Sequence, residues 1–122
     1  MCGVCFQMQK DTGLWYSVEY SSFSVGPETD KYRLSVSGFS GDIGDALAAP
    51  AHPGRIANGM KFSTPDDDND NSSGNCAYSV GWWFNECSRS VLNRKVDKGA
   101  WNPDTDVTVK DVQFDRMLVK LD

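Results

Sequence analysis

The segment "NGMKFSTPDDDNDNSSGNCAYSVGWWFNEC" (residues 58–87) decides how this sequence is interpreted. Four aspartates lie within five positions of it, with no basic residue between them: Asp66, Asp67, Asp68 and Asp70. Because Asp, Asn, Ser and Gly favour turns, the simplest interpretation is a solvated acidic turn. Carboxylates about 4–8 Å apart, however, repel by about 0.5–1 kcal/mol per pair even in water. An expected short strand at 60–64 and the aromatic run at 82–84 bound this loop and limit how far it can spread, so a bound cation would relieve the repulsion.

The spacing of the aspartates distinguishes two kinds of calcium loop. Asp66, Asp68 and Asp70 have the 1-3-5 spacing of an EF-hand. An EF-hand also needs Gly at its sixth position and Glu at its twelfth, where this sequence has Asn71 and Ala77. Alternating hard oxygen ligands followed by a Ser-Ser-Gly turn fit a different loop, because Ca²⁺ accepts six to eight oxygen ligands in flexible geometry. The pattern therefore favours a calcium loop that is not an EF-hand.

The residues upstream are typical of short strands separated by turns. The segments "LWYSVEYSSFSV" (14–25) and "KYRLSVSGF" (31–39) alternate in polarity, and the Gly-Pro turn between them predicts an antiparallel hairpin. In the second segment, Tyr32, Leu34 and Val36 are expected on one face. Residues 45–49 are a candidate for a short helix that ends at Pro50.

The residues downstream predict further buried structure. The run "WWF" (82–84) is expected in the core, because adjacent aromatic side chains beside a cysteine usually pack inside. The segment "VTVKDVQFDRMLVKL" (107–121) predicts one or two terminal strands, with Val112, Phe114 and Leu118 as core candidates.

Length and charge disfavour several classes of protein. A sequence of 122 residues corresponds to one domain, and its net charge of −5 argues against nucleic acid and anionic membrane surfaces as partners. No apolar run is long enough to span a bilayer, and the N-terminus does not match a signal peptide, so a secreted form would have its leader removed or outside this chain. With one histidine and no Gly-rich phosphate loop, we expect no enzymatic activity.

The four cysteines allow several interpretations. Cys76 and Cys87 flank the aromatic run and could close a small loop. Cys2 and Cys5 form a C-x-x-C pair, which as a redox site would need a helix N-terminus after a strand. As a zinc site the pair would need two more ligands, and His52 is the only histidine. A local or interchain disulfide and two free thiols are the alternatives.

The segment 58–87 resembles the calcium-loop region of fibrinogen-related domains, the module found in fibrinogen chains, ficolins and tachylectins. The segments "EYSSFSVGPETDKYRLSVSGFSGDIGDAL" (19–47) and "CSRSVLN" (87–93) are similar to other parts of the same module. The resemblance implies an α+β fold that is mainly antiparallel β-sheet, with short helices and a loop-rich calcium-binding subdomain.

The extent of the resemblance sets the expected domain organisation. The similarity runs from about Trp15 to the end of the sequence, so residues 1–14 are expected to be an N-terminal extension that can be disordered. Residues 15–64 would form the β-sheet region and residues 65–122 the calcium- and ligand-binding subdomain. We expect an exposed sheet edge before Trp15, which would favour a homo-oligomer.

The resemblance also assigns roles in the acidic loop. It implies that Asp68 and Asp70 provide side-chain ligands to Ca²⁺ and that Ser72 and Gly74 provide backbone carbonyls. Asp66 and Asp67 would then supply outer charge. Cys76 and Cys87 would form a disulfide.

In the lectin members of the family, acetyl groups bind beside this loop, next to a peptide bond that is often cis. Here that bond would join Glu86 to Cys87, and the pocket would be lined by Tyr78, Glu86, Cys87 and Ser88. Ser88 stands where lectin members have a histidine. The implied function is a secreted pattern-recognition lectin that binds acetylated sugars of the N-acetylglucosamine type, or a microbial surface polysaccharide, in innate immunity. The alternative is a protein-interaction module of the same fold without sugar binding.

Overall fold

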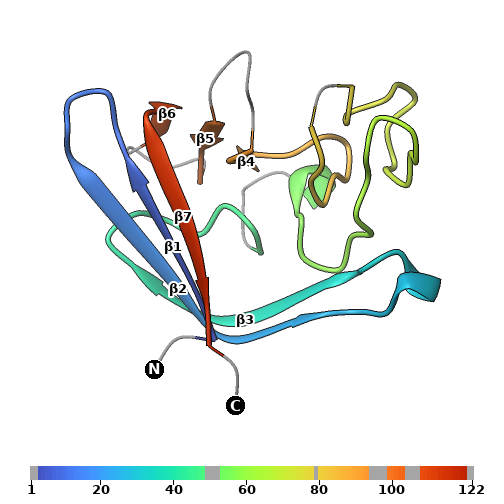
Figure 1. The fold of residues 1–122 in the computed structure, drawn as a ribbon, viewed down its shortest axis with the longest axis horizontal. Helices are drawn as coiled ribbons and strands as arrows, with labels where there is room; N and C mark the ends of the chain where they lie inside the picture. The colour runs from blue at the N-terminus through green and yellow to red at the C-terminus, as the bar shows by residue number, and fades with distance from the viewer. Residues whose placement is uncertain (1–2, 49–52, 79, 94–98, 104–107, 121–122) are drawn as a thin grey trace.

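The computed structural model describes residues 3–48, 53–78, 80–93, 99–103 and 108–120. These residues form two antiparallel sheets (Figure 1). The larger sheet has the strand order β3-β2-β1-β7, and its strands are β1 (Val4–Gln9), β2 (Trp15–Val25), β3 (Leu34–Gly41) and β7 (Phe114–Val119). The smaller sheet has the order β4-β5-β6, from β4 (Ser90–Val91), β5 (Gly99–Trp101) and β6 (Val109–Val112). The helices described are two short 3₁₀ turns, η1 (Glu28–Asp30) and η2 (Pro53–Arg55).

The predicted hairpin is confirmed. Strands β2 and β3 pair antiparallel from Val25 opposite Leu34 to Val18 opposite Gly41. Leu34 and Val36 are buried as expected, whereas Tyr32 is 45% exposed and lies in the turn before the strand. Lys31 and Tyr32, the two residues after η1, both have a left-handed φ, of 54° and 56°, in the turn that leads into β3.

The expected N-terminal extension is not observed, because residues 4–9 form β1 in the interior of the larger sheet. The strand pairs with β2 on one side and with β7 on the other. Val4, Phe6 and Met8 are fully buried, and Gln7 and Gln9 alternate with them. This period-two pattern is present in the sequence. One partner, β7, lies about a hundred residues away, so local patterning could not place β1 in a sheet.

The candidate helix at 45–49 is replaced by a bend, as far as residue 48, the last residue described there. The Oδ1 atom of Asp45 accepts hydrogen bonds from the backbone N–H groups of Leu47 (3.0 Å) and Ala48 (2.9 Å). The hydroxyl of Tyr20 donates to the same oxygen at 2.5 Å. An Asp side chain that binds the backbone two and three residues ahead stabilises a turn in place of a helix.

The core lies between the two sheets and this bend. Phe6 packs against Tyr20 (6.2 Å between ring centroids) and against Trp101 (5.6 Å), which joins the larger sheet to the smaller one. The indole N–H of Trp101 donates to the carbonyl of Gly44 at 2.8 Å. Trp82, Trp83 and Phe84 are buried as predicted.

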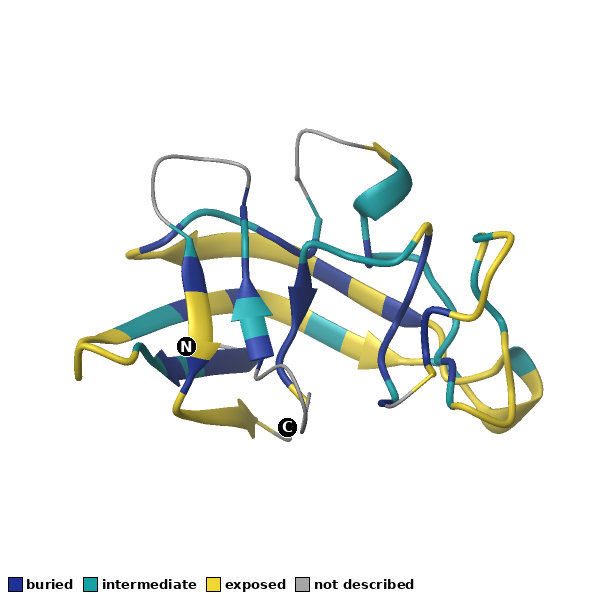
Figure 2. Ribbon diagram, turned by 90° about the horizontal axis from the view of Figure 1, so that it is seen from above, coloured by how far each residue is buried: buried dark blue, intermediate teal, exposed yellow. Residues whose placement is uncertain are grey.

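The C-terminal residues form two strands, β6 and β7, as predicted. Val112 is buried, but Phe114 and Leu118 are 66% and 46% exposed, so their assignment to the core is wrong. Both lie on the outer face of edge strand β7, opposite Gln9 and Cys5. Figure 2 shows β7 exposed along its length, whereas buried and exposed bands alternate along β2. The expected strand at 60–64 is reduced to isolated bridges at Ser63 and Thr64.

Among the described residues there is no helix of the length and apolar character that a membrane crossing would need.

Tyr20→Phe tests the junction between β2 and the bend. The variant keeps the ring but removes the hydroxyl that donates to Asp45, which should lower the free energy of unfolding by about 1–3 kcal/mol in urea titrations. Tyr16→Phe is the control, because the structure describes no hydrogen bond from its hydroxyl. Equal effects of the two substitutions would contradict this role for the Tyr20 hydroxyl.

Alkaline pH gives a second test of the same contact. Burial and the hydrogen bond to Asp45 raise the pKa of Tyr20 well above its usual value. The unfolded tyrosine has a pKa of about 10, so the folded state binds more protons above that pH and stability is lost as pH rises. In Tyr20→Phe, the fall in stability above about pH 10 should be less steep than in the wild type.

Candidate metal centre in the acidic loop

The acidic loop lies beside the turn between β2 and β3, at the end of the molecule opposite β1 and β7 (Figure 1). Thr64 and Asp67 exchange two backbone hydrogen bonds of 3.1 Å, which close a tight turn around Pro65 and Asp66. The Thr64 hydroxyl donates to the Asp66 carboxylate at 2.8 Å. The first two aspartates are therefore part of a fixed turn.

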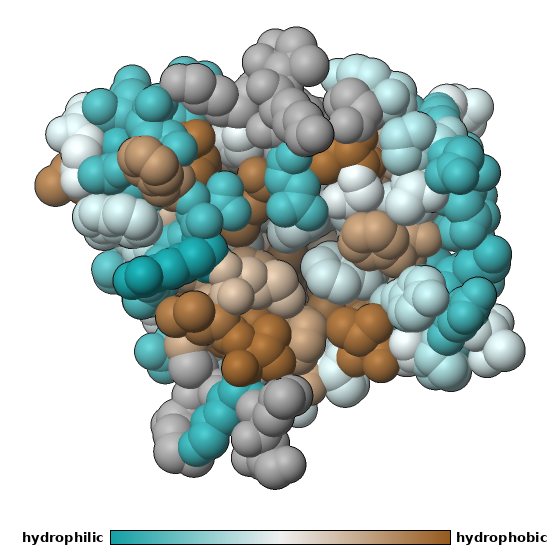
Figure 3. All heavy atoms as spheres, in the orientation of Figure 1, coloured by the Kyte–Doolittle hydropathy of each residue, from teal (hydrophilic) through white to brown (hydrophobic). Residues whose placement is uncertain are grey.

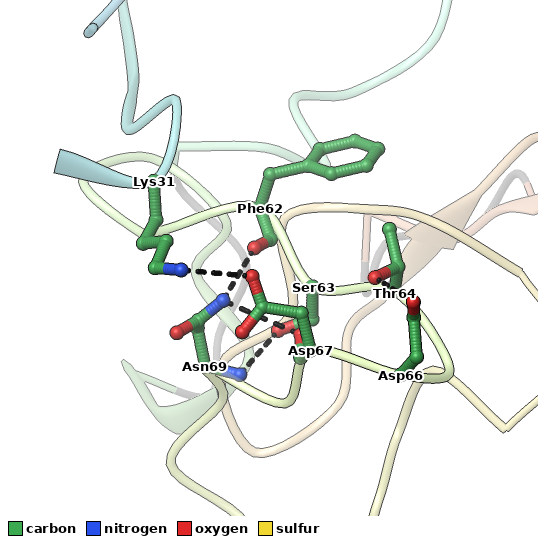
Figure 4. A network of polar contacts seen from close by, with 7 residues as sticks. All are labelled: Lys31, Phe62, Ser63, Thr64, Asp66, Asp67 and Asn69. Atoms are coloured by element: carbon green, nitrogen blue, oxygen red, sulfur yellow. Dashed lines mark hydrogen bonds and ion pairs between the residues drawn. The ribbon is translucent and has the colours of Figure 1, made fainter. Parts of the chain in front are cut away.

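The loop is tied to its surroundings through Asp67 and Asn69 (Figure 4). The Lys31 ammonium, from the β2–β3 turn, lies 3.0 Å from the Asp67 carboxylate. This charge-assisted hydrogen bond lowers the pKa of Asp67. The Asn69 side chain donates to the carbonyl of Phe62 at 2.9 Å, and its backbone N–H donates to the hydroxyl of buried Ser63 at 2.9 Å. These contacts prevent the loop from spreading away from the fold.

The carboxylates of Asp68 and Asp70 accept hydrogen bonds from backbone N–H groups that follow them in the loop. The Asp70 N–H donates to Asp68 Oδ1 at 3.1 Å. The two oxygens of Asp70 accept from the N–H groups of Ser72 (2.9 Å) and Cys76 (3.0 Å). Each carboxylate oxygen has a second lone pair, so these bonds orient the carboxylates and leave capacity for a further ligand. Asp70 also links the loop to the cysteine at its end.

The chemistry of these donors fits a hard cation. Within the described residues, the ion pairs within 4.0 Å are Lys31–Asp67 and Arg33–Asp30, so neither Asp68 nor Asp70 has a cationic side chain beside it. No group of three or more His, Cys, Asp or Glu side chains converges in the described part of the molecule. A metal bound here would therefore take its remaining ligands from carbonyls such as those of Ser72 and Gly74, which suits Ca²⁺ and not Zn²⁺.

The disulfide between Cys76 and Cys87 is confirmed, with a Cα–Cα distance of 5.3 Å. Cys5 is also disulfide-bonded and lies within interior strand β1. It does not occupy the helix N-terminus that a thiol redox site needs. Cys2 and His52 lie outside the described residues. The described cysteines are thus structural crosslinks.

Asn85 is a site residue that the sequence analysis missed. It is 8% exposed, and its Oδ1 accepts from the Asn71 side chain at 2.9 Å, while its carbonyl accepts from the Asn71 N–H at 3.0 Å. The Asn85 side chain in turn donates to the carbonyl of Ile56 at 3.1 Å. A single amide after the buried run 82–84 therefore connects the acidic loop to the segment after η2. A polar residue directly after three buried aromatics was the signal in the sequence.

Three of the four predicted pocket residues, Tyr78, Glu86 and Cys87, line neither of the two hollows that the structure describes. Tyr78 is 65% exposed, and Glu86 is exposed with its N–H donating to the carbonyl of Gly54 at 2.8 Å. The peptide bond between Glu86 and Cys87 is trans, unlike the cis bond implied by the lectin members, and Cys87 has a left-handed φ of 57°.

Ser88, the fourth predicted residue, has different neighbours. Its hydroxyl donates to the carbonyl of Ser90 at 2.9 Å. It lines a hollow of about 70 Å³ together with Arg89, Val91 and Ala100. A hollow of this size holds a small group and not a whole sugar.

Comparison with known proteins identifies the family. The family model for the C-terminal globular domain of fibrinogen beta and gamma chains matches residues 3–112. Human fibrinogen-like protein 1 is 42% identical over 94 residues, which cover 72% of this chain and 30% of that protein. The gamma subunit of human fibrinogen is 41% identical over 97 residues, which cover 71% of this chain and 21% of that protein. This chain therefore spans less than a third of the length of either relative.

Solved structures agree with the assignment. The fibrinogen-like globe domain of human ANGPTL6 matches 96% of this chain and 55% of its own length, with a TM-score of 0.80 and 30% identity. The lamprey fibrin D-dimer, solved with the peptide ligand Gly-His-Arg-Pro-amide, matches 93% of this chain and 43% of its own, with a TM-score of 0.79 and 27% identity. The protein belongs to the family defined by the C-terminal globular domain of the fibrinogen beta and gamma chains.

Proposed function

We propose that this fibrinogen-related domain is a secreted, non-enzymatic recognition module in which Ca²⁺ stabilises the acidic loop and the adjoining surface binds a protein or peptide. The observation that carries the proposal is the anchored pair Asp68 and Asp70. Their carboxylates are held by backbone N–H groups and have no cationic side chain beside them among the residues described. Disulfide-bonded cysteines support an oxidising, extracellular location.

The residues that would hold Ca²⁺ are Asp68 and Asp70, through their carboxylates, and Ser72 and Gly74, through their carbonyls. The bound ion would neutralise the acidic loop without contacting the partner. The protein itself provides the rigid frame: Asn69 and Asn85 fix the two sides of the loop, and the disulfide fixes its end. Calcium binding would therefore add stability to a loop that is largely folded already.

A peptide or protein partner is supported by the family and by surface charge. The lamprey fibrin relative was solved with a peptide ligand that carries basic residues. The present protein has a net charge of −5, and its exposed Glu86 lies next to the disulfide. Opposite charges on ligand and surface speed association and favour basic partners.

The second candidate is binding of an acetylated sugar such as N-acetylglucosamine on microbial surfaces, as in innate immunity. The observation that favours it is Tyr78, an aromatic side chain that is 65% exposed two residues after Cys76. An exposed aromatic ring provides a platform for the apolar face of a sugar ring.

The sequence analysis expected a homo-oligomer to form through an edge before Trp15, and we propose that it forms through strand β7 instead. The edge before Trp15 is covered by β1, whereas β7 is an edge strand. Apolar surface lies near the two termini (Figure 3), where Met117, Leu118 and Val119 at the end of β7 are 38%, 46% and 46% exposed. Exposed apolar edge strands are prone to pairing with another chain.

Calcium should raise the melting temperature of the wild-type domain relative to chelator. At a calcium concentration one hundred times Kd, the stabilisation should be about 2.7 kcal/mol. Asp68→Asn keeps an acceptor for the Asp70 N–H but removes the charge, so it should lose most of this gain. Asp66→Asn, which changes an outer carboxylate, is the matched control. Identical wild-type melting curves in calcium and in chelator would contradict the site.

The disulfide should support the same loop. It closes a loop of about a dozen residues, which corresponds to about 3 kcal/mol of stability. In the double variant Cys76→Ser, Cys87→Ser, we expect a lower free energy of unfolding. We also expect weaker calcium binding, because the disulfide no longer holds the backbone N–H of residue 76 in position to donate to Asp70. Calcium affinity that does not change in the folded double variant would show that the disulfide does not organise the metal site.

Titration of single sites separates the two candidate ligands. Gly-His-Arg-Pro-amide should bind weakly, at about millimolar Kd, and Glu86→Gln should weaken it. N-acetylglucosamine should be compared with glucosamine and with the Tyr78→Ala variant. Binding that requires the acetyl group and Tyr78 would favour the lectin, whereas binding of the peptide alone would favour the protein-interaction module.

A further inference from the structure

A second recessed site lies on the outer face of the larger sheet, at the end of β2 far from the acidic loop. It is an open groove of about 330 Å³, within the size range of small-molecule sites. Its lining residues are Gln7, Trp15, Tyr16, Ser17, Asp42 and Arg116. None of them contributes to the calcium loop or to its neighbouring surface.

Strand register brings three of these side chains into one row. Gln7 of β1 lies opposite Ser17 of β2 on one side and opposite Arg116 of β7 on the other. Residues directly opposite in antiparallel strands have side chains on the same face, so the row crosses the outer face of the sheet. Trp15 lies two residues before Ser17 and therefore on the same face.

The guanidinium of Arg116 is positioned by its neighbours. Its Nε donates to Oε1 of Gln7, and its central carbon lies 5.9 Å from the centroid of the Trp15 ring. A guanidinium has five N–H donors, and the contact with Gln7 uses one nitrogen. No ion pair within 4.0 Å involves Arg116 among the described residues. The two terminal nitrogens can therefore receive a carboxylate in bidentate geometry.

Asp42 forms the opposite wall of the groove. Its Oδ1 accepts from the Ser17 N–H at 2.8 Å, and its own N–H donates to the Ser17 carbonyl at 3.1 Å. These two bonds hold the carboxylate beside the sheet, and its second oxygen remains an acceptor for ligand hydroxyl groups. The groove thus combines a cation, an exposed indole, a hydroxyl and a fixed acceptor.

We propose that this groove binds a carboxylate-bearing saccharide, of the uronic or sialic acid class. The carboxylate pairs with Arg116, the ring lies against Trp15, and ring hydroxyls donate to Asp42. A neutral sugar offers no anion to the two terminal nitrogens of Arg116, and a phosphate monoester brings a nearly double negative charge toward Asp42. A compact ring with one carboxylate and several hydroxyls matches both walls.

Tryptophan fluorescence provides a direct probe of this groove. Trp15 is 50% exposed, whereas Trp82, Trp83 and Trp101 are at most 7% exposed, so collisional quenching by acrylamide reports mainly on Trp15. Methyl glucuronide should protect the wild-type domain from quenching at millimolar concentrations, and methyl glucoside, which lacks the carboxylate, should not. Protection should be the same in calcium and in chelator, which separates this site from the proposed calcium-dependent function.

Arg116→Gln should weaken the methyl glucuronide interaction by about tenfold or more, since it removes a charge-assisted pair. Lys110→Gln removes the same charge from an exposed position on β6 outside the groove and should leave the affinity unchanged. Asp42→Asn should reduce affinity with less effect on carboxylate selectivity. Equal protection by the glucoside, no protection by either sugar, or unchanged affinity in a folded Arg116→Gln variant would overturn the proposal.

Discussion

The half-buried carboxylate of Asp45 is the contact on which the two-sheet arrangement depends. One oxygen of this side chain accepts the Tyr20 hydroxyl from β2 and two backbone N–H groups from its own bend. The adjacent Gly44 carbonyl accepts the indole N–H of Trp101 from β5. The bend therefore connects the interior of the larger sheet to the smaller sheet through hydrogen bonds. Phe6 packs against both the Tyr20 and the Trp101 rings, so apolar side chains surround these hydrogen bonds. Because a buried polar group without a partner is unfavourable, the loss of any one of these hydrogen bonds would be costly.

The acidic loop uses the same local chemistry as the bend, but with a different balance of charge. Asp70, like Asp45, folds the following backbone by accepting N–H groups. Asp45 is one carboxylate shared among three donors beside the core. The loop instead has four carboxylates within five residues, and the one ion pair described for them neutralises Asp67. The single carboxylate of the bend already accepts three hydrogen bonds, whereas the acidic loop retains negative charge that its own donors do not balance. This difference is the physical basis for proposing a cation in one place and not in the other.

The sequence was informative where the decisive partners are local and uninformative where they are distant. The β2–β3 hairpin follows from alternation and turn chemistry, and the Cys76–Cys87 bond follows from the resemblance to fibrinogen-related domains. Strand β1 was missed because β7, which completes its pairing, comes from the other end of the sequence. Phe114 was placed in the core because apolar residues usually are, although it lies on the outer face of an edge strand. The role of Asn85 depends on Asn71 and Ile56, which only folding brings together.

Strand β2 separates the two candidate sites and makes them independent. Trp15 and Ser17, at its start, line the outer groove, and its far end leads into the turn that provides Lys31 to the acidic loop. Between these ends, Val18 and Tyr20 are fully buried and paired on both sides, so a change in loop structure meets a rigid strand. Ordering of the acidic loop by a cation would therefore act on the surface around Cys87 and leave the groove unchanged. In such a domain the two proposed recognition surfaces would be separate, and calcium at the acidic loop would affect one of them and not the other.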